Sequence, residues 1–178
     1  MHDIKDIVEV ILFASNRPIN QEDIEKVIDG ENFDIRKVVK ELNTQYHKNN
    51  KGYSIVNVAN GYRIQSNPDY HEYISKINSV TKKISLSNSA LEALAIISYK
   101  QPISKVEIDN LRGINSSSVI NTLLKNDLIT IKGREKKFGR SVLYGTTINF
   151  LQIFGLSDIN DLPSENELDL IINNNEIK

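Results

Sequence analysis

One short pattern occurs twice in this sequence and constrains the fold more than any other feature. Residues 18–27 and 102–111 both read Pro-Ile-(Asn/Ser)-x-x-(Asp/Glu)-Ile-x-x-(Val/Leu). Asn20 and Ser104 are preferred N-cap residues, and the acid three positions later completes a capping-box pattern. Each copy therefore predicts a helix that starts directly after a proline turn, and the chain as a whole predicts one arrangement used twice.

Further helices are predicted on both sides of each copy, where apolar residues recur at the spacing of a helix packed on a core. Their ranges are 3–15, 34–48, 88–99 and 115–126. In the second half, the residues expected to be buried are Leu91, Leu94, Ala95, Ile96, Ile97, Val119, Leu123 and Leu124. The helices that begin at the repeats are expected to end at Gly30 and Gly113. Each half then contains a helix-turn-helix followed by a third helix.

After each third helix the apolar spacing changes from helical to alternating. Residues 53–65 alternate around Asn60-Gly61, a dipeptide typical of a two-residue hairpin turn. Residues 128–132 and 142–145 predict a second hairpin. Three helices followed by a hairpin is the winged-helix arrangement. The predicted fold class is therefore mainly α with small sheets (α+β), as two tandem winged-helix domains.

One more helix is expected to close each half. In the first half, Tyr70, Tyr73, Ile74 and Ile77 are expected to form its buried stripe; in the second half, Ile148, Phe150, Leu151 and Phe154 occupy a short helix that ends at Gly155. The predicted domains are 1–79 and 87–157, separated by a linker at 80–86. Residues 158–178 form an acidic tail that is expected to fray beyond Pro163.

The residue types needed for catalysis are sparse. The chain has no cysteine, and its three histidines, His2, His47 and His71, show no metal-ligand spacing. No glycine-rich phosphate loop is present. The first residues have neither the basic start of a signal peptide nor an apolar run long enough to span a membrane. We expect a soluble, cytoplasmic protein that is not an enzyme and has no metal and no cofactor.

Basic residues gather in the second predicted hairpin. The segment from Lys125 to Arg140 contains six cations and only two carboxylates. The cations that could contact DNA are Lys132, Arg134, Lys136, Lys137 and Arg140. Such a wing can lie along a phosphate backbone, or it can be a solvated loop that discourages strand pairing. The net charge of −1 and the neutral character assigned to the third helices argue against DNA as the main partner.

The first helix carries more apolar residues than one packed face needs. Val10, Phe13 and Ala14 extend its stripe around most of the circumference. This helix is either buried on several sides or forms a subunit interface. For the interface, the residues expected to take part are Ile7, Val10, Ile11 and Ala14.

Several motifs in the second half closely resemble the bacterial segregation and condensation protein B family. They are 86–103 (LSNSALEALAIISYKQPI), Glu107-Ile108, 111–115 (LRGIN), Gly133-Arg134, Gly139-Arg140, 143–147 (LYGTT), Phe150-Leu151, 154–156 (FGL) and 161–163 (DLP). Ser141 departs from the family pattern, which often has proline there, and this predicts a looser wing. The first half resembles the family mainly in architecture.

The resemblance implies a homodimer, paired through the first domains, that binds the kleisin subunit of bacterial condensin. Through the kleisin it would join the ATPase of the structural maintenance of chromosomes type, with weak or indirect DNA contact, no catalysis and no cofactor. The residues expected at the kleisin are Tyr99, Gln101, Pro102, Phe150 and Phe154. The alternative is a DNA-binding transcriptional regulator with tandem winged helices.

Overall fold

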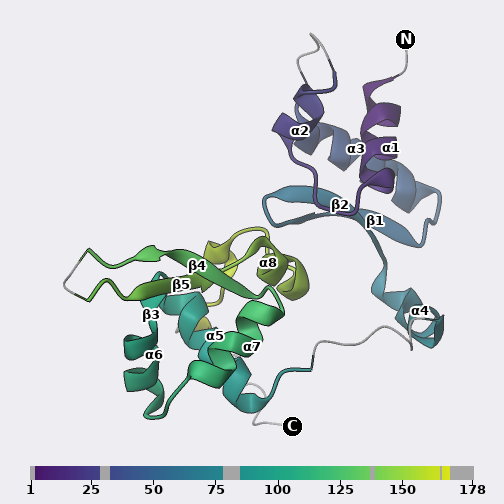
Figure 1. The fold of residues 1–178 in the computed structure, drawn as a ribbon. Helices are drawn as coiled ribbons and strands as arrows, with labels where there is room; N and C mark the ends of the chain where they lie inside the picture. The colour runs from purple at the N-terminus through teal and green to yellow at the C-terminus, as the bar shows by residue number, and fades with distance from the viewer. Residues whose placement is uncertain (1–2, 29–32, 78–84, 137–138, 165, 169–178) are drawn as a thin grey trace. The chain divides into compact units, whose positions relative to one another are not determined.

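A computed structural model describes residues 3–28, 33–77, 85–136, 139–164 and 166–168 (Figure 1). The chain divides into two compact units, residues 1–85 (unit 1) and 86–178 (unit 2). Each unit combines helices with a small antiparallel sheet, so the expected mixture of helices and strands is confirmed. Gly30, Lys137, His2, most of the predicted linker and the tail beyond residue 168 lie outside the described residues.

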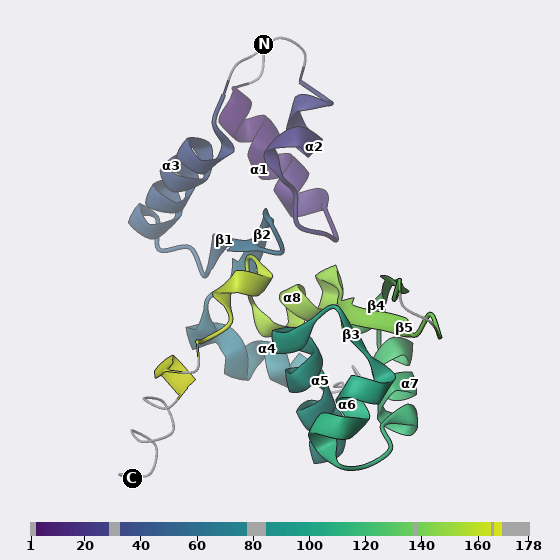
Figure 2. The ribbon, with the colours of Figure 1, turned by 90° about the vertical axis from the view of Figure 1, so that its left-hand side faces the viewer.

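Unit 1 packs its first helix against its third helix and its hairpin (Figures 1 and 2). Its elements are α1 (Ile4–Ala14), α2 (Gln21–Glu25), α3 (Ile35–Lys48), β1 (Tyr53–Val58), β2 (Gly61–Ser66), the short 3-10 helix η1 (Pro68–Tyr70) and α4 (His71–Ile77). Val8, Ile24 and Leu42 are at most 2% exposed and mark the centre of the core. Three helices and a hairpin therefore share one apolar interior.

Unit 2 follows the same order and adds a short third strand. Its elements are α5 (Asn88–Lys100), β3 (Ile103–Ser104), α6 (Lys105–Arg112), α7 (Ser117–Lys125), β4 (Ile129–Arg134), β5 (Val142–Thr146), α8 (Ile148–Phe154) and the 3-10 helix η3 (Ile159–Asp161). The sheet order is β3-β5-β4. Helix α5 packs against α6, α7 and β5, and Ile97, Ile108 and Leu123 are fully buried between these elements.

Both predicted capping boxes are present. In unit 1, Asn20 Oδ1 accepts from Asp23 N at 2.9 Å, and Asn20 N donates to Asp23 Oδ2 at 3.2 Å. In unit 2, Ser104 Oγ accepts from Glu107 N at 3.4 Å, and Ser104 N donates to Glu107 Oε2 at 2.9 Å. The repeated sequence therefore encodes the same reciprocal cap twice, and each cap fixes where the second helix begins.

The residue before each cap also joins the helices to the hairpin. Ile19 exchanges two backbone hydrogen bonds with Tyr62, of 2.9 and 2.8 Å. Ile103 is likewise paired with Tyr144 on β5. Both isoleucines are 4% exposed. The sequence indicates the buried apolar side chains, but the strand pairing becomes visible only in the structure.

The turn of the first hairpin lies one residue earlier than predicted. Ala59 and Asn60 form it, with φ values of 50° and 58°, and Gly61 pairs with Val58 as the first residue of β2. A Cβ on Gly61 would lie 3.0 Å from Pro18 Cβ and 3.1 Å from the backbone of Ile19. This glycine is therefore required by the close approach of the Ile19 segment, and not by the turn itself.

Two helices bury a different set of residues from the predicted one. On α5 the buried residues are Ala90, Ala93, Leu94, Ile97 and Ser98, whereas Leu91 is 46% exposed and Ala95 is exposed. On α7, Ile120 and Leu123 are buried, and Val119 and Leu124 are only half-buried. Three of the five buried residues on α5 are small, and small side chains allow packed elements to approach closely, so residue size decides the buried face along with hydrophobicity.

The predicted buried stripe of α4 is wrong. Tyr70 is 45% exposed, Tyr73 is 67% exposed and Ile77 is 82% exposed, and only Ile74 is half-buried. The helix follows the hairpin after the core of unit 1 is already closed, so its apolar residues find no interior to fill. Helix α2 is also shorter than predicted, since it ends at Glu25.

The carboxylate of Asp23 is held in two ways. Arg17 Nη1 and Nη2 donate to its two oxygens at 2.7 and 2.9 Å, and Asn20 N donates from the cap. These interactions lower the pKa of Asp23 from 3.8 to about 2, with the Arg17 hydrogen bonds as the largest cause. Because the folded pKa is below the unfolded one, the charged carboxylate stabilises the fold above about pH 4, and this contribution is lost as the pH falls towards 2.

Asp23→Asn is expected to lower the free energy of unfolding near neutral pH by about 1–2 kcal/mol, because the cap and the charged pair with Arg17 are both weakened. The gap between variant and wild type should shrink as the pH is lowered from about 4 to about 2. Urea unfolding followed by circular dichroism measures both effects. Asp69→Asn, at an exposed carboxylate, is the control, and a gap that does not change with pH would contradict the account.

Candidate functional site

Among the described residues, no group of three or more His, Asp or Glu side chains is placed to hold a metal ion. His47 on α3 and His71 on α4 are both exposed. In the same part of the chain, no helix is both long and apolar enough to cross a bilayer. The two units instead expose four faces, which differ in being apolar, aromatic or basic.

The first face is apolar and lies on α1. Phe13 is 81% exposed and Val10 is 64% exposed, and Ala14 beside them is exposed as well. Of the four residues predicted for an interface, Val10 and Ala14 therefore face outward, whereas Ile7 and Ile11 are half-buried, with Ile11 packed against the core. Phe13 belongs to the apolar surplus of this helix and lies on the same face, although it is not among the four residues expected from the sequence. It is the largest side chain on this face.

The second face lies at the end of α5 and on α8 in unit 2. Tyr99 is 43% exposed and Phe154 is 47% exposed, and Pro102 is also exposed. The Tyr99 hydroxyl donates to the Pro163 carbonyl at 2.8 Å, which ties the segment after α8 to α5. Three of the five residues predicted to bind a kleisin are thus available at the surface.

The other two residues predicted for that site have structural positions. Phe150 is 3% exposed, and its ring packs against the ring of Phe154, with 4.7 Å between the two ring centroids. Gln101 is half-buried and bonded to Thr146: its Oε1 accepts from Thr146 N at 2.7 Å, and its Nε2 donates to Thr146 Oγ1 at 3.0 Å. Gln101 therefore fixes the end of α5 to the strand that leads into α8.

Several residues of the family-like motifs serve the fold in the same way. Gly113 and Gly155 adopt left-handed conformations, with φ values of 70° and 68°, and end α6 and α8. Thr147 caps α8 by accepting from Phe150 N at 3.1 Å. These motif positions specify helix ends, so they identify the architecture more than they identify a contact surface.

The third face is the basic hairpin of unit 2. Lys132, Arg134, Lys136 and Arg140 are exposed, and within the described residues none of them pairs with a carboxylate. Glu135 N donates to the Ser141 carbonyl at 2.9 Å, so the backbone remains paired at the position where the family often has proline. The cations are exposed on a hairpin and have no carboxylate partner in the part of unit 2 that is described; Arg134 Nη1 donates to the Arg140 carbonyl at 3.4 Å.

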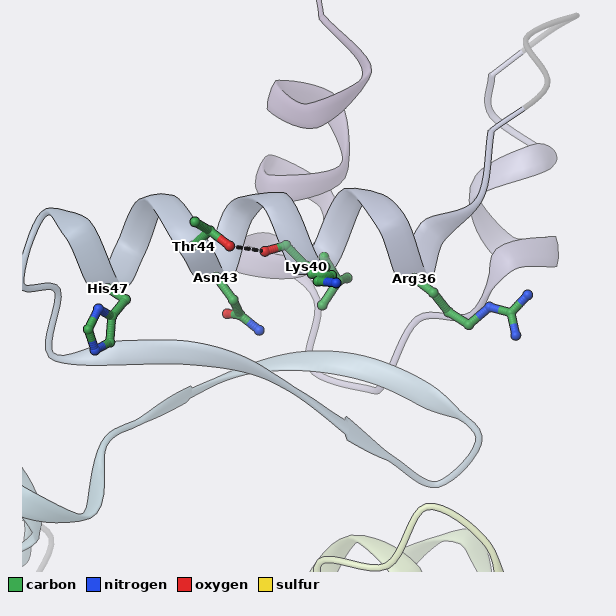
Figure 3. Close-up of a pocket in the computed structure, with 6 residues that line it drawn as sticks. Arg36, Lys40, Asn43, Thr44 and His47 are labelled. Atoms are coloured by element: carbon green, nitrogen blue, oxygen red, sulfur yellow. Dashed lines mark hydrogen bonds between the residues drawn. The ribbon is translucent and has the colours of Figure 1, made fainter.

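The fourth face lies on α3, and the neutral character expected for this third helix is wrong. Arg36, Lys37, Lys40 and Lys48 stand against one carboxylate, Glu41. A shallow groove of about 580 Å³ runs along this side (Figure 3), and its lining residues are Arg36, Val39, Lys40, Asn43, Thr44 and His47. The spacing of basic residues in 34–48 carries this signal in the sequence itself.

Gly145→Ala should destabilise unit 2, because a Cβ at this position would lie 2.7 Å from Gln101 Oε1 and 2.8 Å from Lys132 Cγ. Moving Gln101 aside breaks its bond to the backbone of Thr146, which is 7% exposed. A loss of about 1–3 kcal/mol is expected. Urea unfolding provides the measurement. Gly52→Ala, which meets only the exposed Tyr70 ring, is the control, and equal stability of both variants would contradict the assignment.

Comparisons with known proteins agree with these motifs. Residues 6–165 match the family model described as "Segregation and condensation complex subunit ScpB". Segregation and condensation protein B of Alkaliphilus oremlandii is 35% identical over 99% of this chain and 95% of its own length. The protein of that name from Clostridioides difficile is 40% identical over 90% and 91%.

Among solved structures, a conserved hypothetical protein from Chlorobium tepidum is 30% identical over 85% of this chain and 95% of its own, with a TM-score of 0.40. The family model and the relatives together cover both units. The chain therefore belongs to the segregation and condensation protein B family.

Proposed function

We propose that this protein is a non-catalytic adaptor of a bacterial chromosome-condensing complex and that it binds the kleisin subunit as a homodimer. The observation that carries the proposal is the family match, which spans residues 6–165. Through the kleisin, the adaptor would act on the ATPase of the structural maintenance of chromosomes type. Its place of action would be the cytoplasm, at the nucleoid.

We further propose that each unit is a winged-helix domain. In unit 1 the helices α1, α2 and α3 are followed by the hairpin β1-β2, and in unit 2 the helices α5, α6 and α7 are followed by β4-β5. Domain limits of 1–79 and 87–157, joined by a linker at 80–86, fit this division. The acidic segment 158–178 would then follow the second domain.

The apolar face of α1 suits the dimer contact. Phe13 and Val10 are 81% and 64% exposed, and covering these large apolar side chains with a second copy would stabilise a dimer. A twofold interface places the same face of both copies together. Ala14 allows close approach of the two helices, and Ile7 and Ile11 would support the contact from the edge.

The face formed by Tyr99, Pro102 and Phe154 suits the kleisin. Its exposed aromatic rings rest on less exposed residues: Phe150 packs against Phe154, and Gln101 fixes the backbone next to Tyr99 and Pro102. Rigid aromatic anchors of this kind contribute strongly to protein interfaces. Family membership favours this adaptor role over the tandem winged-helix transcriptional regulator, and the basic wing would contribute DNA contact at most indirectly.

The double variant Val10→Glu with Phe13→Glu is expected to be a folded monomer. Neither side chain belongs to the core, so only the contact between copies should be lost through burial of charge. Size-exclusion chromatography with light scattering measures the mass, and circular dichroism checks the fold. Val27→Glu, at another exposed apolar residue of unit 1 (67%), should leave the dimer intact. A dimer that survives the double variant would remove α1 from the interface.

Phe154→Ala is expected to weaken binding of the purified kleisin subunit by about tenfold or more in calorimetry, as for an aromatic anchor. Ile131→Ala, at a residue of β4 that is 58% exposed, is the matched control and should bind normally. Thermal unfolding establishes that both variants remain folded. Unchanged affinity of the Phe154 variant would count against the proposed kleisin face.

A further inference from the structure

Helix α3 concentrates positive charge in a chain that is slightly acidic overall. This helix contains four cations and one carboxylate, whereas the chain as a whole has a net charge of −1. The corresponding helix of unit 2, α7, carries Lys125 as its only charged residue. The excess charge is therefore a property of one helix and does not follow from the general composition.

Two of these cations, Arg36 and Lys40, form a row with the histidine His47. Each residue turns a helix by about 100°, so Arg36, Lys40 and His47 lie within about 40° of one another around the axis and extend over about 16 Å. All three line the shallow groove on α3 (Figure 3). Lys37 lies on the flank, where a second hollow contains Asp34 and Glu41.

The row is weakly neutralised by the protein itself. Arg36 contacts Asp34 at its own N-cap, at 3.2 Å, and the Arg36 side chain is 79% exposed. Glu41 is engaged by Lys5, at 3.3 Å. Within the described residues no carboxylate pairs with Lys40 or with His47. Phosphate groups can therefore approach Lys40 without displacing an internal pair, whereas at Arg36 they compete with Asp34, whose two oxygens accept from Arg36 at 3.2 and 3.4 Å.

The uncharged polar groups along the groove are already used. Asn43 binds the backbone of Ile55 on both sides: its Nδ2 donates to the carbonyl at 2.8 Å, and its Oδ1 accepts from the amide at 2.8 Å. The Thr44 hydroxyl donates to the Lys40 carbonyl at 2.8 Å (Figure 3). The amide and hydroxyl groups that could read base edges from this side are therefore engaged, and the exposed groups that remain are cationic side chains, which bind phosphates of any sequence.

The shape of the surface favours a duplex over a small ligand or a peptide. All six residues that line the groove belong to α3, so the groove has no opposing wall, and its one apolar residue, Val39, is 6% exposed. A bound peptide would need apolar pockets, whereas a protruding cationic helix can lie in or along a groove of DNA. We propose that the outer face of α3 binds the phosphate backbone of duplex DNA without sequence preference.

This contact goes beyond the proposed kleisin binding and does not depend on it. It lies on unit 1, whereas the basic hairpin expected from the sequence lies on unit 2. Each phosphate contact adds to the salt dependence, because bound cations are released from the duplex. The proposal therefore predicts binding that falls steeply with ionic strength and is equal for unrelated sequences.

The test uses the full chain and two fluorescently labelled duplexes of unrelated sequence, titrated by anisotropy at several salt concentrations. Arg36→Gln with Lys40→Gln should weaken binding of both duplexes by about tenfold at moderate salt. The slope of log affinity against log salt should flatten by about 2. The matched control is Lys100→Gln with Lys125→Gln, which removes the same charge from helices of unit 2 and should change neither quantity. Circular dichroism and thermal unfolding establish that both double variants are folded.

Three outcomes would overturn the proposal. The wild-type chain could fail to bind either duplex at low salt, or the α3 variant could bind as tightly as the wild type. Alternatively, the α3 variant could lose binding to a labelled polyglutamate peptide while its duplex affinity stays unchanged, which would make the surface a site for an acidic protein segment. A parallel variant, Arg134→Gln with Arg140→Gln, assigns any remaining duplex binding to the basic hairpin.

Discussion

Backbone pairing between the residue before each second helix and the second strand of each hairpin holds helices and sheet together. Ile19 pairs with Tyr62 in unit 1, and Ile103 pairs with Tyr144 in unit 2. An isolated two-stranded hairpin is marginal in water, so each hairpin is stabilised by the packed helices together with this pairing, which is a single bridge in unit 1 and the short strand β3 in unit 2. Gly61 follows from this constraint, because the Ile19 segment leaves no room for a Cβ there.

The motifs that connect this chain to its family act mainly on the same framework. Gln101 fixes the end of α5 to Thr146, and Gly113 and Gly155 end their helices in a left-handed conformation. Such residues specify the architecture and do not by themselves specify a contact surface. This explains why the family is readily identified from the second half of the sequence, although the contact residues for a partner are not.

Unit 1 presents two faces of opposite character. Helix α1 exposes Val10 and Phe13, whereas α3 exposes a row of basic groups that includes Arg36 and Lys40. Burial of an apolar face against another protein is favourable, and so is contact between a cationic face and phosphate. The two surfaces therefore favour partners of different chemistry. One small unit could therefore pair with a second copy through α1 and contact a nucleic acid through α3.

The sequence alone determined the features that depend on neighbours along the chain. The capping boxes at Asn20 and Ser104, the order of the helices and hairpins, and the excess of apolar residues on the first helix all arise from contacts or spacings within a few positions. The tertiary structure alone decided the turn at Ala59, the burial of small residues on α5, the exposure of α4 and the bond between Gln101 and Thr146. Each of these depends on which distant segment fills the adjacent space, and residue type and local spacing do not specify that.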